Sequence, residues 1–166
     1  MNLDNLEIYG FKGSIEDVNQ TLDFLKTIQS SHPDCIIQFL DANHIAGQKH
    51  IRHGVFQAIN AFNREENIAN DLSVEIVLRS SAQRQISKAF EILGVKKGKM
   101  DLCIVMMNCS NEIYDQLSTM YERDDNVLLK DSSKLLKVYD ISSEELSIMD
   151  IEDILIDKIT KLNVDY

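Results

Sequence analysis

The segment VLRSSAQRQISKAFEILG, residues 77–94, combines positive charge with the pattern of a helix start. Ser80 and Gln83 have the Ser-x-x-Gln spacing of a capping box, which predicts that a helix begins here. Arg79 and Arg84 flank that predicted N-terminus, although the positive end of a helix dipole disfavours cations. Free backbone N–H groups and arginine side chains at one helix start favour the same anion. The pattern therefore predicts a phosphate-binding site.

A second group of basic side chains lies in the first turns of a helix predicted over about residues 48–62. This group consists of Lys49, His50, Arg52 and His53. Two helix starts rich in basic residues strengthen the prediction of an anion site. On the helix predicted over about residues 83–93, Arg84 and Lys88 lie one turn apart, opposite the apolar face, and Gln85 lies to one flank.

Structural explanations compete with these interpretations. Glu75 and Arg79 have the i, i+4 spacing of an ion pair within a helix, and the other cations would then simply face water. His50 and His53, with His44 upstream, could belong to a metal site, but no carboxylate or thiol completes a zinc set at a usual spacing. Exposed histidines on a basic helix are the favoured interpretation, so we predict no metal ion and no cofactor.

The sequence contains no recognisable catalytic motif. It has no Gly-x-Gly-x-x-Gly, no Walker-type loop and no nucleophile elbow. The many carboxylates near the C-terminus belong to a predicted helix with an obvious solvated side. We therefore predict that the protein is not an enzyme and has no catalytic residues.

Composition and charge predict one globular domain over residues 1–166. Hydrophobic residues make up 44% of the chain and charged residues 27%, and the net charge of −10 argues against a general nucleic-acid binder. The charge is unevenly distributed, however. Residues 39–99 hold nine Lys and Arg against six Asp and Glu, whereas residues 1–38 hold two against six and residues 100–166 hold six against fifteen. The cations thus gather in the central third, although chance segregation on solvated faces would give the same pattern.

Cysteine usage and hydropathy predict a cytoplasmic protein. Cys35, Cys103 and Cys109 are an odd set without Cys-x-x-Cys spacing, and we expect them to be reduced thiols in the core. No apolar run approaches the roughly 20 residues needed to span a bilayer. The N-terminal residues MNLDNLEIYG lack the layout of a signal peptide.

Periodicity predicts a mixed α/β (α+β) fold with a small mixed sheet, a central helical cluster and a long C-terminal helix. The predicted strands are residues 6–10, 35–40 and 102–107, with a further short strand at 127–129. A turn at Gly13 precedes a helix capped by Ser14. The other predicted helices follow the same rules, and residues 71–80 are ambiguous between helix and strand. The predicted helices cover about residues 15–29, 48–62, 83–93 and 111–123.

The predicted last helix has an unusually wide apolar face. Ser142 and Glu145 form a capping box that opens it, and it extends to about Leu162. Its apolar arc covers roughly 220°, whereas about 100° is typical of a helix with one core face. The arc contains Ile148, Met149, Ile151, Ile154, Leu155, Ile156, Ile159 and Leu162. Either this helix is deeply buried, or part of it binds a partner helix or groove.

The central part of the chain resembles a known family. The pieces DANHIAGQKHIRHG, ENIANDLSVEIVLR and SSAQRQISKAFEILG lie within residues 39–95. This run resembles the kinase-binding subunit of the KEOPS (EKC) complex, the family that includes TPRKB. The resemblance looks continuous over about residues 36–108, and it rests on a run of positions rather than on a catalytic motif.

The resemblance implies a function in tRNA modification. KEOPS makes threonylcarbamoyladenosine next to the anticodon, and this family is not its transferase. The family binds and regulates the kinase-like ATPase subunit, helps to recruit tRNA through its 3′ CCA end, and contacts the transferase and dimerisation subunits only indirectly. It also implies a mixed α/β fold with a helical centre, and helix for residues 71–80.

Two sets of candidate residues follow. A reader of the CCA end needs phosphate neutralisation and contacts to splayed bases. The candidates for tRNA binding are Lys49, His50, His53, Arg79, Gln83, Arg84, Gln85 and Lys88, with Asn70 as a further base-edge partner. The candidates for binding the ATPase subunit are Ile151, Ile154, Leu155, Ile156 and Ile159.

Two other functional classes stay open at this point. A small enzyme that binds a phosphometabolite could use the same anion site, although no general base accompanies it. A protein-interaction module without RNA contact would leave the basic third as solvated surface. Salt-dependent tRNA binding would separate the KEOPS subunit from the interaction module without RNA contact.

Overall fold

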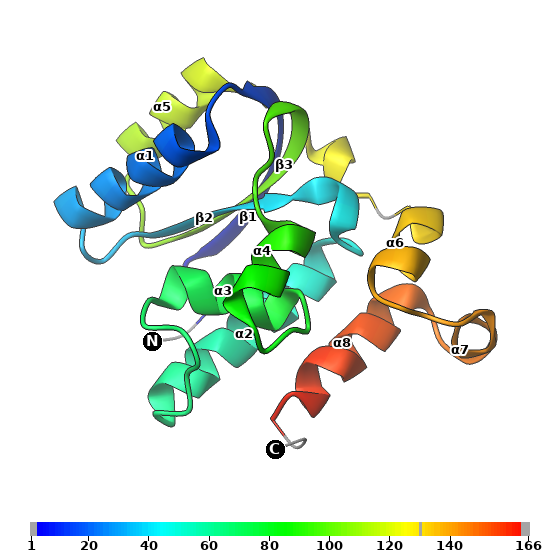
Figure 1. The fold of residues 1–166 in the computed structure, drawn as a ribbon. Helices are drawn as coiled ribbons and strands as arrows, with labels where there is room; N and C mark the ends of the chain where they lie inside the picture. The colour runs from blue at the N-terminus through cyan, green and yellow to red at the C-terminus, as the bar shows by residue number, and fades with distance from the viewer. Residues whose placement is uncertain (1–2, 130, 164–166) are drawn as a thin grey trace.

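A four-stranded antiparallel sheet with helices on both faces organises the protein (Figure 1). The computed structural model describes residues 3–129 and 131–163. The strand order is β2-β3-β1-β4, and every pairing is antiparallel. The strands are β1 Leu6–Ile15, β2 Ile36–Asp41, β3 Gly98–Met107 and β4 Glu122–Arg123. The predicted mixed α/β class is confirmed, whereas the prediction of a mixed sheet is wrong.

Helices form a layer on each face of the sheet. α1 and α5 cover one face, and α2, α3 and α4 cover the other, with α8 packed along α2 (Figure 1). The helices are α1 Val18–Ser31, α2 Gln48–Asn63, α3 Leu72–Ser80, α4 Ile86–Leu93, α5 Asn111–Met120, α6 Ser132–Val138, α7 Ser143–Ile148 and α8 Ile151–Lys161. Two short 3-10 helices are η1 Ala42–His44 and η2 Asp125–Leu128. None of these helices has the length and apolar character needed to cross a bilayer.

The central strand β3 is apolar throughout because helices bury both of its faces. Ile104 and Met106 contribute to the core beneath α1 and α5, while Cys103, Val105 and Met107 contribute to the core beneath α2, α3 and α4. Successive side chains of a strand point to opposite faces, so a strand covered on both sides has no polar alternation. A third, smaller core joins α6 to α8 through Leu135, Tyr139, Ile151 and Leu155.

The first strand is longer than the sequence pattern predicts. β1 continues through Gly13 to Ile15, which pairs with Gly98 of β3. Gly13 is therefore not a turn; a side chain at this position would collide with the ring of Tyr121. Ser14 does not cap α1, because the Asp17 carboxylate accepts the backbone N–H of Gln20 instead.

The boundary between α3 and α4 differs from the capping-box prediction. α3 continues through Ser80, and α4 begins only at Ile86, with Gln85 as its N-cap. The residues between them form a turn in which Ala82 has φ +55°. Arg79 therefore lies in the last turn of α3, where a helix dipole favours a cation. The puzzle of an arginine at a helix start disappears.

The predicted long C-terminal helix is also wrong, because the structure divides it in two. The Ser142–Glu145 capping box is present, but the helix that it opens ends at Ile148. Met149 is extended, and Asp150 is the N-cap of α8. Two further predictions are corrected. The helix predicted to reach residue 123 ends at residue 120, and residues 125–128 form η2 where a short strand was predicted at 127–129.

Two of the three cysteines form a disulfide, contrary to the prediction of three reduced thiols. The Sγ atoms of Cys35 and Cys109 are 2.09 Å apart, and Cys103 is a free, buried thiol. Ile36 pairs with Met107 in neighbouring strands, which brings the two flanking cysteines together. The cysteines therefore lend no support to the predicted cytoplasmic location.

Candidate nucleic-acid and partner interfaces

Arg79 lies inside the protein rather than on its surface. Its side chain is 1% exposed, and its Nε donates to the Glu75 carboxylate at 2.9 Å. The second oxygen of Glu75 accepts the backbone N–H groups of Ile68 and Ala69. This carboxylate is therefore paired and hydrogen-bonded, as a buried charge must be. The ion pair that sequence spacing offered as the structural alternative is present.

The same network connects α3 to the end of α8. The Arg79 Nη1 group donates to the Asn163 side-chain oxygen at 2.8 Å, and Asn163 donates to the Gln57 side chain of α2 at 2.7 Å. Arg79 also reaches the carbonyl of Glu66 at 3.4 Å. Arg79 thus holds three segments together, and its guanidinium is not presented to solvent.

His50 is also fully buried. Its Nδ1 accepts the Ala46 backbone N–H at 2.9 Å, so its Nε2 carries the proton that is donated to the Ser80 carbonyl at 2.7 Å. Loss of solvation lowers the pKa of His50 to about 4, although its bond to Ser80 opposes the shift. The ring is therefore neutral near pH 7 and serves as a tie between α2 and α3.

Lys49 and His53 lie at the seam between α2 and α8. The Lys49 ammonium is 3.1 Å from the Asp153 carboxylate, and His53 Nε2 is 2.8 Å from the Thr160 hydroxyl. Partial burial lowers the pKa of His53. The Lys49 side chain is 65% exposed, so its ion pair with Asp153 is weak and open to competition.

The turn between α3 and α4 forms a pocket against α8. The pocket has a volume of about 330 Å³, which lies at the small end of the range for ligand sites. Its lining includes Gln83 together with Lys158 and Lys161 of α8. Next to it, the exposed Arg84 side chain donates to the Leu162 carbonyl at 2.9 Å. Two candidate residues thus meet two lysines from the opposite end of the chain.

Other candidates lie on exposed helix surface. Gln85 is exposed as the N-cap of α4, Lys88 is exposed on α4, and Asn70 is exposed before α3. The structure therefore divides the eight tRNA-binding candidates into a buried pair, His50 and Arg79, and a group at or near the surface. Whether any of them contacts RNA stays a prediction.

The apolar face of α8 is used mainly by the protein itself. Four of the five candidates for ATPase binding are buried, and Ile156 is half-buried. The buried residues are Ile151, Ile154, Leu155 and Ile159. α8 contacts both α2 and the small core with α6, which explains a wider apolar arc than one core face needs.

An exposed apolar groove lies between α7 and α8. Ile148 is 84% exposed and Met149 is 40% exposed. The groove has a volume of about 270 Å³, and Ile154 contributes to its lining. Lys158 and Lys161 line it as well, so it adjoins the pocket beside Gln83. We call this feature the α7–α8 groove.

Sequence reasoning missed the residues that the fold adds to these surfaces. Lys158 and Lys161 belong to none of the candidate sets predicted from the sequence, and Ile148 and Met149 were predicted only as part of the apolar arc of the last helix. The lysines lie in the last turn of α8, and the two apolar residues lie at the end of α7, where the helix stops after Ile148. That break exposes the apolar pair, and no local pattern in the sequence predicts it.

Comparison with known proteins identifies relatives of the chain. Residues 15–161 match the family described as kinase binding protein CGI-121. The chain is also similar to the regulatory protein Cgi121 of Methanocaldococcus jannaschii, with 36% identity over 91 residues. That match covers 55% of this chain and 59% of the archaeal relative.

Proposed function

The chain belongs to the CGI-121 family of kinase-binding proteins, and we propose that it is a non-catalytic, regulatory subunit of a KEOPS-type complex. The single observation that carries this proposal is the family match over residues 15–161, which spans nearly the whole chain. We further propose that residues 1–166 act as one domain of this family in the cytoplasm. Its proposed partners are the kinase-like ATPase subunit and the 3′ end of tRNA. The threonylcarbamoyl transferase and the dimerisation subunit would be reached through the ATPase.

We assign docking of the ATPase subunit to the α7–α8 groove. The exposed Ile148 and Met149 side chains provide apolar area at its rim, and Ile154 provides the floor. Exposed apolar side chains around a concavity are typical of protein interfaces. The charged side chains that line the groove carry both signs, Glu145 and Asp157 against Lys158 and Lys161, so its apolar rim rather than net charge would hold the partner.

We assign the tRNA 3′ end to the pocket beside Gln83 and to the cations near it. Arg84, Lys158 and Lys161 supply positive charge there, and Gln83 supplies donors and acceptors for a base edge. Because Lys158 and Lys161 also line the α7–α8 groove, the ATPase and the tRNA end would bind side by side. A single subunit could in this way connect the two.

Two competing functions make different predictions. A phosphometabolite enzyme would turn over a small phosphorylated substrate, and a plain interaction module would bind the ATPase without any salt-dependent affinity for tRNA. Purified protein that binds tRNA in a salt-dependent manner and turns over no such substrate supports the proposed subunit.

Substitution in the α7–α8 groove tests the kinase assignment. Ile148→Glu places a charge at the most exposed position of the groove and should leave the fold intact. If Ile148 is a central contact, affinity for the ATPase subunit should fall roughly 30-fold, the effect of losing about 2 kcal/mol. Calorimetry of the purified pair measures this change.

A matched control and a rival variant make the result decisive. Leu129→Glu introduces the same charge at another exposed apolar residue and should bind normally. Ile156→Glu alters the seam between α2 and α8. If only Ile156→Glu loses binding, the interface lies at that seam. If Ile148→Glu and Ile156→Glu both bind normally, α8 is not the docking element.

A further inference from the structure

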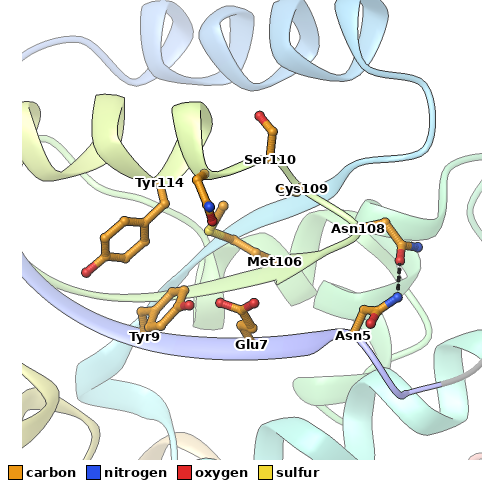
Figure 2. A pocket seen from close by; sticks show the side chains of 9 residues that line it. Asn5, Glu7, Tyr9, Met106, Asn108, Cys109, Ser110 and Tyr114 are labelled. Carbon is orange, nitrogen blue, oxygen red and sulfur yellow. Dashed lines mark hydrogen bonds between the residues drawn. The ribbon is translucent and has the colours of Figure 1, made fainter.

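The face of the sheet covered by α1 and α5 carries a separate pocket of about 380 Å³ (Figure 2). It lies between the first residues of β1, the last residues of β3 and the start of α5. Its lining is Asn5, Glu7, Tyr9, Met106, Asn108, Cys109, Ser110, Asn111 and Tyr114. The kinase and tRNA surfaces lie on the opposite side of the sheet, so neither assignment uses this pocket.

Glu7 gives the pocket an exposed carboxylate. Its carboxylate points into the pocket between Tyr9 and Asn5 (Figure 2). Within the described residues, no cation forms an ion pair with Glu7. The guanidinium of Arg123 binds both carboxylate oxygens of Asp125, at 2.8 and 2.7 Å, and its Nη1 also donates to the hydroxyl of Tyr114 at 2.8 Å, so its charge is shared between Asp125 and the edge of the pocket. The pocket also joins the two acidic parts of the chain, residues 1–38 and 100–166.

Two aromatic rings stand beside this carboxylate. The ring centroids of Tyr9 and Tyr114 are 5.1 Å apart, and the two ring planes are inclined by 60° to each other, so the rings form a tilted aromatic pair. Arg123 already places its guanidinium carbon 4.2 Å from the Tyr9 ring centroid, on the side of β4. Tyrosine faces attract cations, and here one such contact is in place.

The frame around the pocket is fixed by long-range links. The Asn5 side chain donates to the Asn108 side-chain oxygen at 2.8 Å, between the ends of β1 and β3. The next residue, Cys109, is held by its disulfide to Cys35. A pocket held in this way loses little entropy when a ligand enters.

We propose that this pocket binds an alkylammonium group, carried either by a lysine side chain of a partner protein or by a free polyamine. Glu7 accepts a charge-assisted hydrogen bond from the ammonium group, and Tyr9 and Tyr114 contact its methylene carbons and its charge. An ammonium group has three donors, and the Asn and Ser oxygens of the lining can accept the remaining two. Met106 provides an apolar floor for the alkyl stem.

Titration of the full-length, 15N-labelled protein tests this proposal. The probes are N-acetyl-lysine methylamide, the same compound acetylated on its ε-nitrogen, and 1,5-diaminopentane. The ammonium-bearing probes should shift the amide signals of Glu7, Tyr9, Asn108 and Tyr114, and the acetylated probe should not. Glu7→Gln should weaken binding about tenfold, because it removes a hydrogen bond between two charged groups.

The control variant is Glu91→Gln, which removes the same charge from an exposed position on α4. It should bind like the wild type. Tighter binding of the lysine probe than of the diamine supports a protein ligand, and the reverse supports a polyamine. The proposal fails if neither ammonium probe shifts the pocket signals, if the acetylated probe shifts them equally, or if Glu7→Gln binds like Glu91→Gln.

Discussion

Arg79 and Arg84 lie five residues apart in the sequence and occupy opposite environments. Arg79 is 1% exposed and is held by Glu75, Asn163 and a backbone carbonyl. Arg84 is exposed on the turn before α4 and contacts the Leu162 carbonyl. Arg79 connects segments of the fold from inside the protein, whereas Arg84 connects the turn to the end of α8 at the surface, where we propose that it also meets an anion. The same type of side chain in the same stretch thus occurs in two environments, one buried and one exposed.

The difference shows that burial decides which cations of a basic cluster can contact a nucleic acid. A buried cation is neutralised inside the protein and cannot reach a phosphate, whereas an exposed cation can neutralise a phosphate of a nucleic acid and release the counterions condensed on it. The central third of the chain therefore contains fewer available cations than its net charge suggests. Lys158 and Lys161, from the acidic third, add positive charge beside Gln83, and Lys161 also forms an ion pair with Asp157 at 2.9 Å.

The largest expected effect is the loss of stability in Arg79→Ala. Removing the guanidinium leaves the Glu75 carboxylate buried without its charged partner, which should lower the free energy of unfolding by about 3–5 kcal/mol. Denaturation in urea measures this loss.

Arg84→Ala is the matched control for that comparison. It removes an arginine from exposed surface and should change the free energy of unfolding by less than about 0.5 kcal/mol. Equal stabilities for the two variants would contradict the division of the arginines into a buried structural one and an exposed one.

His50 should give a smaller, pH-dependent effect. Its pKa is about 4 in the folded protein, and an unfolded chain has the usual histidine pKa of 6.5. As the pH falls, the unfolded chain therefore binds the proton first. The stability that the neutral ring provides is fully present above pH 6.5 and is lost as the pH falls towards 4, by about 3 kcal/mol in total. His50→Gln should remove this part of the pH dependence.

His53→Gln serves as the comparison for His50→Gln. Its ring is only partly buried, so its substitution should leave most of the pH dependence in place. Unfolding free energies measured from pH 7 to pH 4 distinguish the two. A wild-type slope in His50→Gln would mean that this ring is not buried in its neutral form.

Local patterns predicted the regular parts of the fold and misjudged its boundaries. The apolar run of β3 and the amphipathic face of α2 were correctly predicted, because burial imposes a period on the sequence itself. Ser80 has the spacing of a cap with Gln83, yet it lies inside α3, where α2 approaches so closely that a side chain at Gly54 would collide with it. Tertiary packing overrides the local signal there.

The candidate sites depended on contacts that no local pattern contains. Arg79 is buried by Asn163, which lies 84 residues away in the sequence. Cys35 and Cys109 pair because β2 and β3 are neighbours, and an odd cysteine count conceals that pairing. The spacing of Glu75 and Arg79 did contain the correct alternative, but choosing it required knowledge of burial.

The smallest effect, and the one that tests function, concerns the salt dependence of tRNA binding. If Arg84 neutralises a phosphate of the single-stranded 3′ end, Arg84→Ala should weaken binding and make the slope of log affinity against log salt shallower by about 0.7. Lys158→Ala should do the same, because its ammonium lines the adjoining pocket. Lys26→Ala removes a cation from α1, on the other face of the sheet, and should leave the slope unchanged.

Trimming the CCA end should weaken binding to the wild type and should matter less for Arg84→Ala, since the lost contact is the same in both cases. Equal affinity of the wild type for intact and trimmed tRNA at two salt concentrations would mean that this surface does not bind the 3′ end, and Arg84 would then be an ordinary solvated cation.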